Sequence, residues 1–332
     1  MTRPIAEEIA AAPFYHGLTP DEVAELAVGL ELRRFRPGEA LMVQGAASDG
    51  AYVIASGAVA VAARLPGGGE AAIAELGPGD LVGEMALLIR GGKRTATARA
   101  VTDVEALFTD RRYFEAALHL LRPASLKVLR QLGLTIAERL RAIRSRSRAL
   151  MEAAPEQGQF RPPPAGEASA RAAFDVRGFL PILPCLADFA PDEIDALFAM
   201  ARVEHVARGA RLTEEGQPGD APRLVVRGAL VLGQRHGEHV HQLDILGPGR
   251  FAGVAAVLEG APASAAIIAA EDSVLLAFDA ARFVALWNGQ DRMALRLLET
   301  INTDLVKSLN IASNHLTRLT AEARVRGLTH SL

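Results

Sequence analysis

Short β-prone runs separated by glycines fill the first part of the chain. The runs cover residues 40–43, 51–54, 58–62, 71–75, 95–99 and 104–108. Strands of this length and spacing are typical of a small all-β barrel or jelly roll. The pattern therefore predicts a β domain in this part of the chain.

Helical patterns flank these runs. Thr19, followed three residues later by Glu22, forms a capping box and predicts a helix start. After Arg122, residues recur in alternating steps of three and four, which is the spacing of a heptad seam. The residues of this seam are Leu126, Leu129, Gly133, Ile136, Leu140, Ile143, Ser147 and Leu150. Gly133 and Ser147 weaken it.

A second seam lies near the end of the chain. Its residues are Leu295, Leu298, Asn302, Leu305, Leu309, Ala312, Leu316 and Leu319. Asn302 is the kind of polar residue that fixes register at some loss of stability. Both seams are either dimer interfaces or helices packed back on their own barrels. The dimer is favoured, so the sequence predicts a homodimer held through these C-terminal helices.

The chain contains an internal repeat. Pro20-Asp21-Glu22 recurs as Pro191-Asp192-Glu193, and Leu76–Gly79 recurs as Leu246–Gly249. Further matched pairs are Gly38 with Gly209, Gly45 with Gly216, Gly57 with Gly228, Gly83 with Gly253, Phe108 with Phe278 and Arg112 with Arg282. These matches predict a tandem duplication, with domains at 1–154 and 174–332 and a proline-rich linker at 155–173.

Composition narrows the class of protein. The 332 residues are 50% hydrophobic and 23% charged, with a net charge of -3, which excludes a disordered chain and a polybasic nucleic-acid binder. No apolar run is long enough to span a membrane, and Glu7 and Glu8 interrupt the N-terminus where a signal peptide needs apolar residues. The expected location is the cytoplasm, with no membrane partner.

Two candidate chemical sites have plainer interpretations. Cys185 lies in an apolar segment without a second cysteine, so a buried structural thiol is favoured over a nucleophile. The cluster of His236, Glu238, His239 and His241 offers metal-ligand side chains. It falls on a predicted hairpin loop, where solvated side chains are favoured, so no metal is expected.

The strongest candidate site lies between Leu81 and Ala100. Gly83 permits close approach of backbone to a ligand, and the apolar stretch 85–89 begins a short helix whose amides can point at an anion. Glu84 can accept a hydrogen bond from a sugar hydroxyl, and Arg94 offers a planar fork of donors that matches a phosphate. Together these groups suit a ribose phosphate.

The segment Val82 to Leu87, with Arg94-Thr95-Ala96 after a six-residue spacer, resembles the phosphate-binding cassette of the cyclic nucleotide-binding domain family. The resemblance implies an α+β fold with two β jelly rolls (double-stranded β-helices), each flanked by helices and followed by a long C-terminal helix.

The same resemblance implies roles for single residues. Glu84 would hold the ribose 2′-hydroxyl, Arg94 the exocyclic phosphate oxygens, and the amides near Met85 and Ala86 the rest of the phosphate, with Gly83 against the sugar. Thr95 takes the position of a hydroxyl that contacts phosphate or guanine. It leaves cAMP and cGMP open, with cAMP favoured.

The base contact is not assigned by the resemblance. The base-contacting hydroxyls of catabolite-activator-like regulators would fall near Ile143 and Arg144, and neither residue matches. Ser145 or a residue of a partner chain is left as the candidate.

The second copy departs from the cassette. It keeps Gly253, but Val254 stands in the place of Glu84 and Ser264 in the place of Arg94. Each lost charge-assisted hydrogen bond is worth about 1.5 to 3 kcal/mol. Copy two is therefore predicted to be degenerate and not to bind a cyclic nucleotide, although its pocket could hold a less charged molecule.

The absence of familiar catalytic motifs predicts that the protein is not an enzyme. Only residues 321–332 follow the second seam, too few for a helix-turn-helix, so no direct DNA binding is expected. The five arginines between Arg139 and Arg148 are interpreted as a solvated helix face.

The favoured hypothesis is a cyclic-nucleotide sensor that couples binding in its first domain to a helix rearrangement and an effector protein. Two alternatives remain. One is a regulator of a kinase, similar to the regulatory subunits of cAMP-dependent protein kinases. The other is a structural scaffold without a ligand, in which Glu84 and Arg94 form a surface ion pair.

Overall fold

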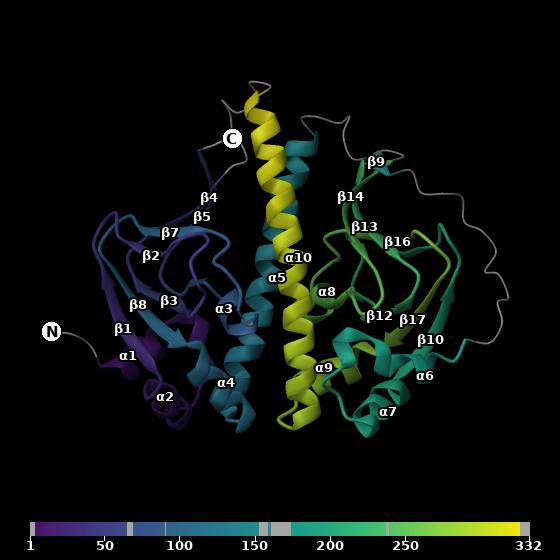
Figure 1. Cartoon of the computed structure of the whole chain (residues 1–332), viewed down its shortest axis with the longest axis horizontal. Helices are drawn as coiled ribbons and strands as arrows, with labels where there is room; N and C mark the ends of the chain where they lie inside the picture. The colour runs from purple at the N-terminus through teal and green to yellow at the C-terminus, as the bar shows by residue number, and fades with distance from the viewer. Residues whose placement is uncertain are drawn as a thin grey trace. The chain divides into compact units, whose positions relative to one another are not determined.

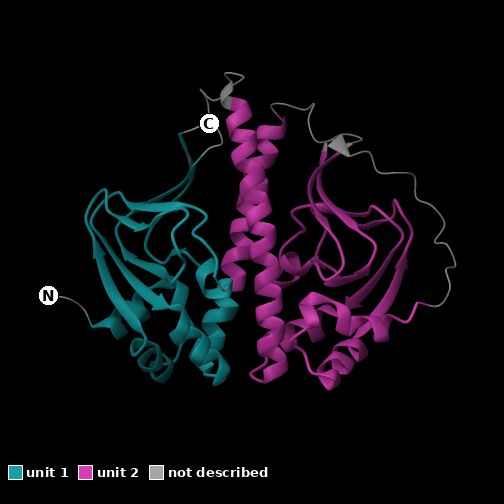
Figure 2. Ribbon diagram, viewed as in Figure 1, with its two compact units in different colours: residues 1–132 teal, residues 133–332 magenta. Residues whose placement is uncertain are grey.

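The structure of the chain is a computed structural model that describes residues 4–64, 69–89, 91–152, 159–160, 174–236 and 239–325. It divides into two compact units, Met1–Leu132 and Gly133–Leu332 (Figure 2). The division falls inside a long helix, α5 (Pro123–Glu152), rather than in the expected linker. The predicted domain limits at 154 and 174 remain predictions.

Unit 1 holds two four-stranded antiparallel sheets (Figure 1). The first has the order β1-β8-β3-β6 and the second the order β2-β7-β4-β5. The strands are β1 (Leu30–Phe35), β2 (Ala40–Met42), β3 (Gly50–Ser56), β4 (Val59–Arg64), β5 (Glu70–Leu76), β6 (Leu81–Val82), β7 (Thr97–Ala100) and β8 (Val104–Asp110). The helices are α1 (Ile5–Ala11), a 3-10 turn (Pro13–Tyr15), α2 (Pro20–Ala27), α3 (Met85–Leu88) and α4 (Arg111–His119).

The core of unit 1 lies between these two sheets. Ile54 and Ala106 from one sheet pack with Val59 and Ala98 from the other, and all four are fully buried. Along β4, buried and more exposed residues alternate, as a strand with one face on the core requires. All six predicted strands are present, which confirms the β domain.

The predicted capping box is also present. The Glu22 amide donates to Thr19 Oγ1 at 3.3 Å, and the Thr19 amide donates to Glu22 Oε2 at 2.7 Å. These two bonds satisfy free amides at the start of α2. The matching helix of the second copy keeps half of this arrangement, because Ala190 replaces the threonine while its amide still donates to Glu193 at 2.7 Å.

Unit 2 repeats the two sheets, with the orders β10-β17-β12-β15 and β11-β16-β13-β14-β9. The strands are β9 (Gln159–Phe160), β10 (Ala201–Val206), β11 (Arg211–Thr213), β12 (Arg223–Arg227), β13 (Leu230–His236), β14 (His239–Leu246), β15 (Phe251–Ala252), β16 (Ala266–Ala269) and β17 (Ser273–Phe278). The helices are α6 (Val176–Phe179), 3-10 turns (Leu180–Ile182 and Pro184–Leu186), α7 (Pro191–Ala199), α8 (Val254–Glu259), α9 (Ala280–Trp287) and α10 (Arg292–Val325). The fold class is therefore as predicted: α+β, with two similar β domains, flanking helices and the long helices α5 and α10.

The extra strand β9 comes from the predicted linker. It pairs antiparallel with β14, with Phe160 opposite Val240 and Gln159 opposite His241. The rest of the linker lies outside the described residues.

Strand pairing corrects the predicted alignment of the two copies. Leu30 of β1 pairs with Thr109, and its counterpart Ala201 pairs with Phe278. Phe278 therefore corresponds to Thr109, not to Phe108 as predicted, and every later residue shifts in the same way, including Arg112. The physical reason is a connection after α8 that is one residue shorter than the one after α3, which a loop tolerates.

The second half of α5 is part of unit 2. A Cβ added to Gly133 would lie 2.7 Å from Cη2 of Trp287 in α9 and 2.3 Å from Oδ1 of Asn302 in α10. Further along α5, Met151 joins the core of the second β domain, against which Leu319 of α10 also packs. Gly133 is thus a point of close contact and not a weakness in the helix.

This packing bears on the two seams. Leu140, Ser147 and Leu298 are buried inside the chain, with 2% or less of each exposed. The seams are thus packed within the chain. The interpretation that each helix packs back on its own barrel is wrong for the second half of α5, which packs against the β domain of copy two. The predicted homodimer remains a prediction.

Candidate functional site

Gly83 joins β6 to α3 and brings the cassette together. Its φ is +82°, and an added Cβ would lie only 2.3 Å from Nη1 of Arg94. Because glycine has no Cβ, the guanidinium can approach the backbone here, and Nη1 donates to the Gly83 carbonyl at 3.3 Å. The two residues that the sequence singled out are thus in direct contact.

Arg94 is fixed at both its backbone and its side chain. Its amide donates to the Ala46 carbonyl at 2.9 Å, and its carbonyl accepts from Gly45 at 2.8 Å. Its Nη2 donates to Oδ1 of Asp49 at 2.8 Å. Only 4% of the Arg94 side chain is exposed, against 66% of the Asp49 side chain.

Glu84 stands directly before α3 and is also buried, with 7% exposed. Its carbonyl accepts from the Leu87 amide at 3.0 Å, which forms the first turn. Glu84 and Arg94 are thus both buried residues. This burial disagrees with the alternative in which they form an ion pair on the surface.

The remaining predicted residues surround this turn. The Ala86 amide donates to the Gly83 carbonyl at 3.0 Å, so this amide already has an acceptor within the turn. The Thr95 hydroxyl is exposed and donates to Sδ of Met85 at 3.6 Å. All six predicted site residues therefore lie along one short stretch of backbone.

Asp49 was missed by the sequence analysis. The signal for it was present, because Asp49 matches Asp220 in the repeat. In the second copy Asp220 pairs with a different arginine, Arg223 of β12, at 2.7 Å. The acid is retained in both copies, while its cation comes from the segment before β7 in copy one and from β12 in copy two.

The corrected alignment changes two assignments in copy two. Ala263 exchanges backbone hydrogen bonds with Gly216 and Gln217, as Arg94 does with Gly45 and Ala46. Ala263 therefore takes the place of Arg94, and Ser264 takes the place of Thr95. The guanidinium is absent from this position as expected, but the hydroxyl of the cassette is kept.

The histidine cluster was considered as a candidate metal site. Among them, no group of three or more histidine, cysteine or acidic side chains could hold a metal ion. Glu238 of the histidine cluster lies outside the described residues. No helix in the described part of the chain is long and apolar enough to cross a membrane.

The geometry agrees with a comparison to known families. The profile described as "Cyclic nucleotide-binding domain" matches residues 32–119 and 203–289, together more than half of the chain. The chain belongs to the cyclic nucleotide-binding domain family. It carries two such domains in tandem.

Several curated proteins are similar to part of this chain. The "Cyclic AMP receptor protein" of Thermus thermophilus is 42% identical over 131 residues, which cover 39% of this chain and 58% of that protein. The "CRP-like cAMP-activated global transcriptional regulator" of Mycobacterium tuberculosis is 33% identical over 105 residues, which cover 32% of this chain and 46% of that protein. The chain thus spans about half the length of these relatives.

The chain is also similar to solved structures. The regulatory domain of Toxoplasma gondii PKA with cAMP is 17% identical and has a TM-score of 0.31, covering 85% of this chain and 90% of its own. A cyclic nucleotide-binding domain from Methylobacillus flagellatus is 24% identical and has a TM-score of 0.38, covering 42% of this chain and 78% of its own.

Proposed function

We propose that the first copy binds a cyclic nucleotide, with cAMP favoured, at Gly83, Glu84 and Arg94. The observation that carries the proposal is the contact between the buried Arg94 guanidinium and Gly83, next to a second buried charged residue, Glu84. A guanidinium and a carboxylate beside a glycine backbone match the phosphate and the 2′-hydroxyl of a ribose phosphate.

The donors of Arg94 leave room for a phosphate. A guanidinium has five N–H groups, of which the Gly83 carbonyl and Asp49 each accept one. The remaining donors can form the bidentate pair that a phosphate prefers. Asp49 therefore holds the guanidinium in position and leaves its other N–H donors available to a phosphate.

The other residues then follow from the resemblance. Glu84 accepts from the ribose 2′-hydroxyl, Gly83 lies against the sugar, and Thr95 offers its exposed hydroxyl to the phosphate or the base. The Met85 amide supports the phosphate, and the Ala86 amide does so after giving up its bond to Gly83. No metal is part of this proposal.

The biological role that fits such a site is regulation rather than catalysis. Helix α5 continues directly from copy one into unit 2, so it is the element through which binding in copy one reaches the rest of the chain. An effector protein that receives this signal is part of the proposal. A regulator of a protein kinase is the alternative within the same class.

Calorimetry on the full chain with cAMP and cGMP tests the proposal. We expect saturable binding to the natural protein and at least about a tenfold loss in Arg94→Ala, because a charge-assisted hydrogen bond is worth about 1.5 to 3 kcal/mol. Arg94→Lys should rescue little, since lysine cannot form the bidentate fork.

Arg99→Ala is the matched control, because Arg99 is an exposed arginine a few residues further on, in β7. The Arg99→Ala protein should bind the cyclic nucleotide with the same affinity as the natural protein. Unchanged affinity in a folded Arg94→Ala protein would refute the assignment and favour the scaffold interpretation.

A further inference from the structure

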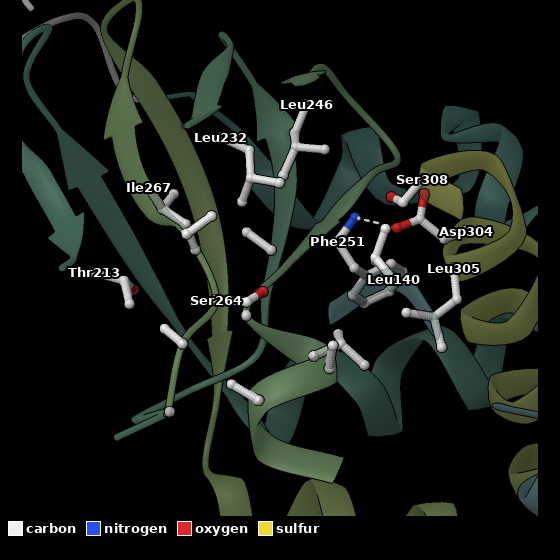
Figure 3. A pocket seen from close by; sticks show the side chains of 18 of the residues that line it. Leu140, Thr213, Leu232, Leu246, Phe251, Ser264, Ile267, Asp304, Leu305 and Ser308 are labelled. Carbon is white, nitrogen blue, oxygen red and sulfur yellow. Dashed lines mark hydrogen bonds between the residues drawn. The ribbon is translucent and has the colours of Figure 1, made fainter. Parts of the chain in front are cut away.

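A cavity of about 60 Å³ lies in unit 2, where the second β domain meets α5 and α10 (Figure 3). Apolar side chains such as Leu232, Leu246 and Ile267 form much of its wall. The cavity occupies the place of the cassette site of copy one. It is lined by Gly253, Val254, Ala263 and Ser264, the counterparts of Gly83, Glu84, Arg94 and Thr95.

The cation at this cavity is a side chain of helix α5 and does not belong to the cassette. Arg144 of α5 lines it, and its Nη1 donates to the Ser264 hydroxyl at 3.1 Å. Only 8% of Arg144 is exposed. Copy two thus has a guanidinium beside its cassette hydroxyl, although its own cassette carries alanine in the place of Arg94.

The position of Arg144 is fixed by its backbone. The Gln234 side-chain amide donates to the Arg144 carbonyl at 3.2 Å and to the Ser264 carbonyl at 3.4 Å. Gln234 thereby ties the turn of α5 that carries Arg144 to the cassette. One turn before it, Arg141 donates to Glu259 of α8 at 2.6 Å and holds the same face of the helix.

The carboxylates near Arg144 pair with other arginines. The charges of Asp244 and Glu259 raise the pKa of Arg144, but Glu259 pairs directly with Arg141. Asp304, which lines the cavity, ion-pairs with Arg250 and accepts from the Phe251 amide at 3.2 Å (Figure 3). Asp244 also pairs with Arg250, at 3.1 Å. Among the described residues no carboxylate forms an ion pair with Arg144, and its buried Nε has no hydrogen-bond partner.

Such a group is unusual. Burial lowers the pKa of Arg144 to about 10, but the group still carries its charge near neutral pH. A buried charge without a direct ion-pair partner is costly, so a ligand that brings an anion to it is favoured. The forked guanidinium and the adjacent hydroxyl match an oxyanion.

We infer that this cavity of copy two is an oxyanion site that takes a phosphate group, with Arg144 supplying the cation that the cassette lacks. The volume accommodates several water molecules and suits a phosphate, but not an intact nucleotide. Val254 offers no acceptor for a ribose hydroxyl. The ligand is therefore inorganic phosphate or the phosphate end of a small phosphomonoester, and the site is independent of the function proposed for copy one.

The test uses the full chain with Arg94→Ala, which removes the cation of copy one. Calorimetry with inorganic phosphate should show saturable binding to this protein. Adding Arg144→Gln, which keeps a hydrogen-bond donor but loses the charge, should weaken binding about tenfold or more. Adding Arg148→Ala instead should leave the affinity unchanged, because Arg148 pairs with Glu215 and does not line the cavity.

Other ligands and variants separate the remaining outcomes. Equal binding of phosphate and methyl phosphate supports free phosphate as the source, and tighter binding of methyl phosphate supports a phosphomonoester. If the Arg144→Gln protein shows no cooperative unfolding transition and is therefore not folded, Ser264→Ala is used in its place. We expect Ser264→Ala to weaken phosphate binding severalfold. Three results would overturn the inference. They are no binding of phosphate, an unchanged phosphate affinity in Arg144→Gln or Ser264→Ala, and binding of acetate as tight as that of phosphate.

Discussion

Arg94 and Asp49 form an ion pair in which the cation is buried and the acid is largely exposed. Nη2 of Arg94 lies 2.8 Å from Oδ1 of Asp49, while Nη1 contacts the Gly83 carbonyl at 3.3 Å. The two contacts fix the plane of the guanidinium and leave its other N–H groups available. Asp49 is therefore a positioning residue of the proposed site.

Replacing Asp49 should weaken cyclic-nucleotide binding less than replacing Arg94. We expect a loss of about two- to tenfold in Asp49→Ala, which corresponds to the roughly 0.5 to 1.5 kcal/mol of a typical hydrogen bond. Asp49→Asn keeps an acceptor and should stay near the natural affinity. Calorimetry with cAMP measures both. Tighter binding in Asp49→Ala would show that the acid competes with the phosphate instead of orienting Arg94.

The second copy should not take up a cyclic nucleotide. Val254 and Ala263 replace the carboxylate and the guanidinium of the cassette, and Arg144 reaches a cavity too small for a nucleotide. We expect a calorimetric stoichiometry of one cyclic nucleotide per chain, and in Arg94→Ala only the weakened site of copy one, with no second site. A stoichiometry of two would mean that copy two rebuilds a nucleotide pocket around Arg144.

The sequence predicted most of the first β domain but missed the strands β1 and β6. The six predicted runs form strands that supply the core between the sheets. Residues 30–35 carry a glutamate and two arginines and do not look apolar. They still form a strand, because the charged side chains find partners: the Arg33 guanidinium lies 3.5 Å above the ring of Phe108.

The contacts made by α5 could not be predicted from local patterns. Arg144 was considered as a poor match to a base-contacting residue and as part of a solvated helix face. The second interpretation is wrong for Arg144, which is buried, because its partner Ser264 lies 120 residues further along the chain. Gly133 was interpreted as a gap in a seam, since the heptad pattern does not show which neighbour approaches the helix. Both interpretations lacked the same information, the identity of the surface against which the helix packs.

Gly133 provides a direct test of this packing. We expect Gly133→Val to lower the free energy of unfolding by about 1 to 3 kcal/mol, the usual cost of overpacking, because the new side chain would collide with Trp287 and Asn302. Ala142→Val adds the same kind of side chain at an exposed position of α5 and should change stability by less than about 0.5 kcal/mol. Thermal and urea unfolding measure the difference. Equal effects of both substitutions would contradict the close contact.

Cys185 should behave as a structural thiol. The structure makes Cys185 only partly buried, less than predicted. This partial burial, followed by the nearby charge of Asp304, raises its pKa to about 12. The folded protein therefore holds the thiol proton more tightly than the unfolded chain. This contribution to stability is complete below pH 9 and is lost as the pH rises toward 12.

Alkylation by iodoacetamide at pH 9 measures the effect. It should be at least about tenfold slower in the folded protein than in urea, because the thiolate is the reactive form. In Cys185→Ser, the fall in the free energy of unfolding between pH 9 and pH 12 should be smaller, because the thiol no longer contributes to it. Equal alkylation rates in the folded and unfolded protein would contradict a buried thiol.

The last prediction concerns the response of α5 to ligand. The helix begins in unit 1, where Lys127 bonds to Glu22 at 2.8 Å, and ends in unit 2, where Gly133, Arg144 and Met151 are held by packing and hydrogen bonds. A cyclic nucleotide that closes the cassette of copy one should repack the first part of the helix. The second part is anchored in the core of unit 2 and resists such a change.

Hydrogen exchange followed by mass spectrometry distinguishes the two parts. With cAMP we expect changed protection in residues 123–132 and little change in residues 133–152. The Arg94→Ala protein is the control and should show no change in either part, because it lacks the cation that binds the phosphate. Equal changes along the whole of α5 would show that the helix moves as one body, in which case copy two itself responds to the ligand of copy one.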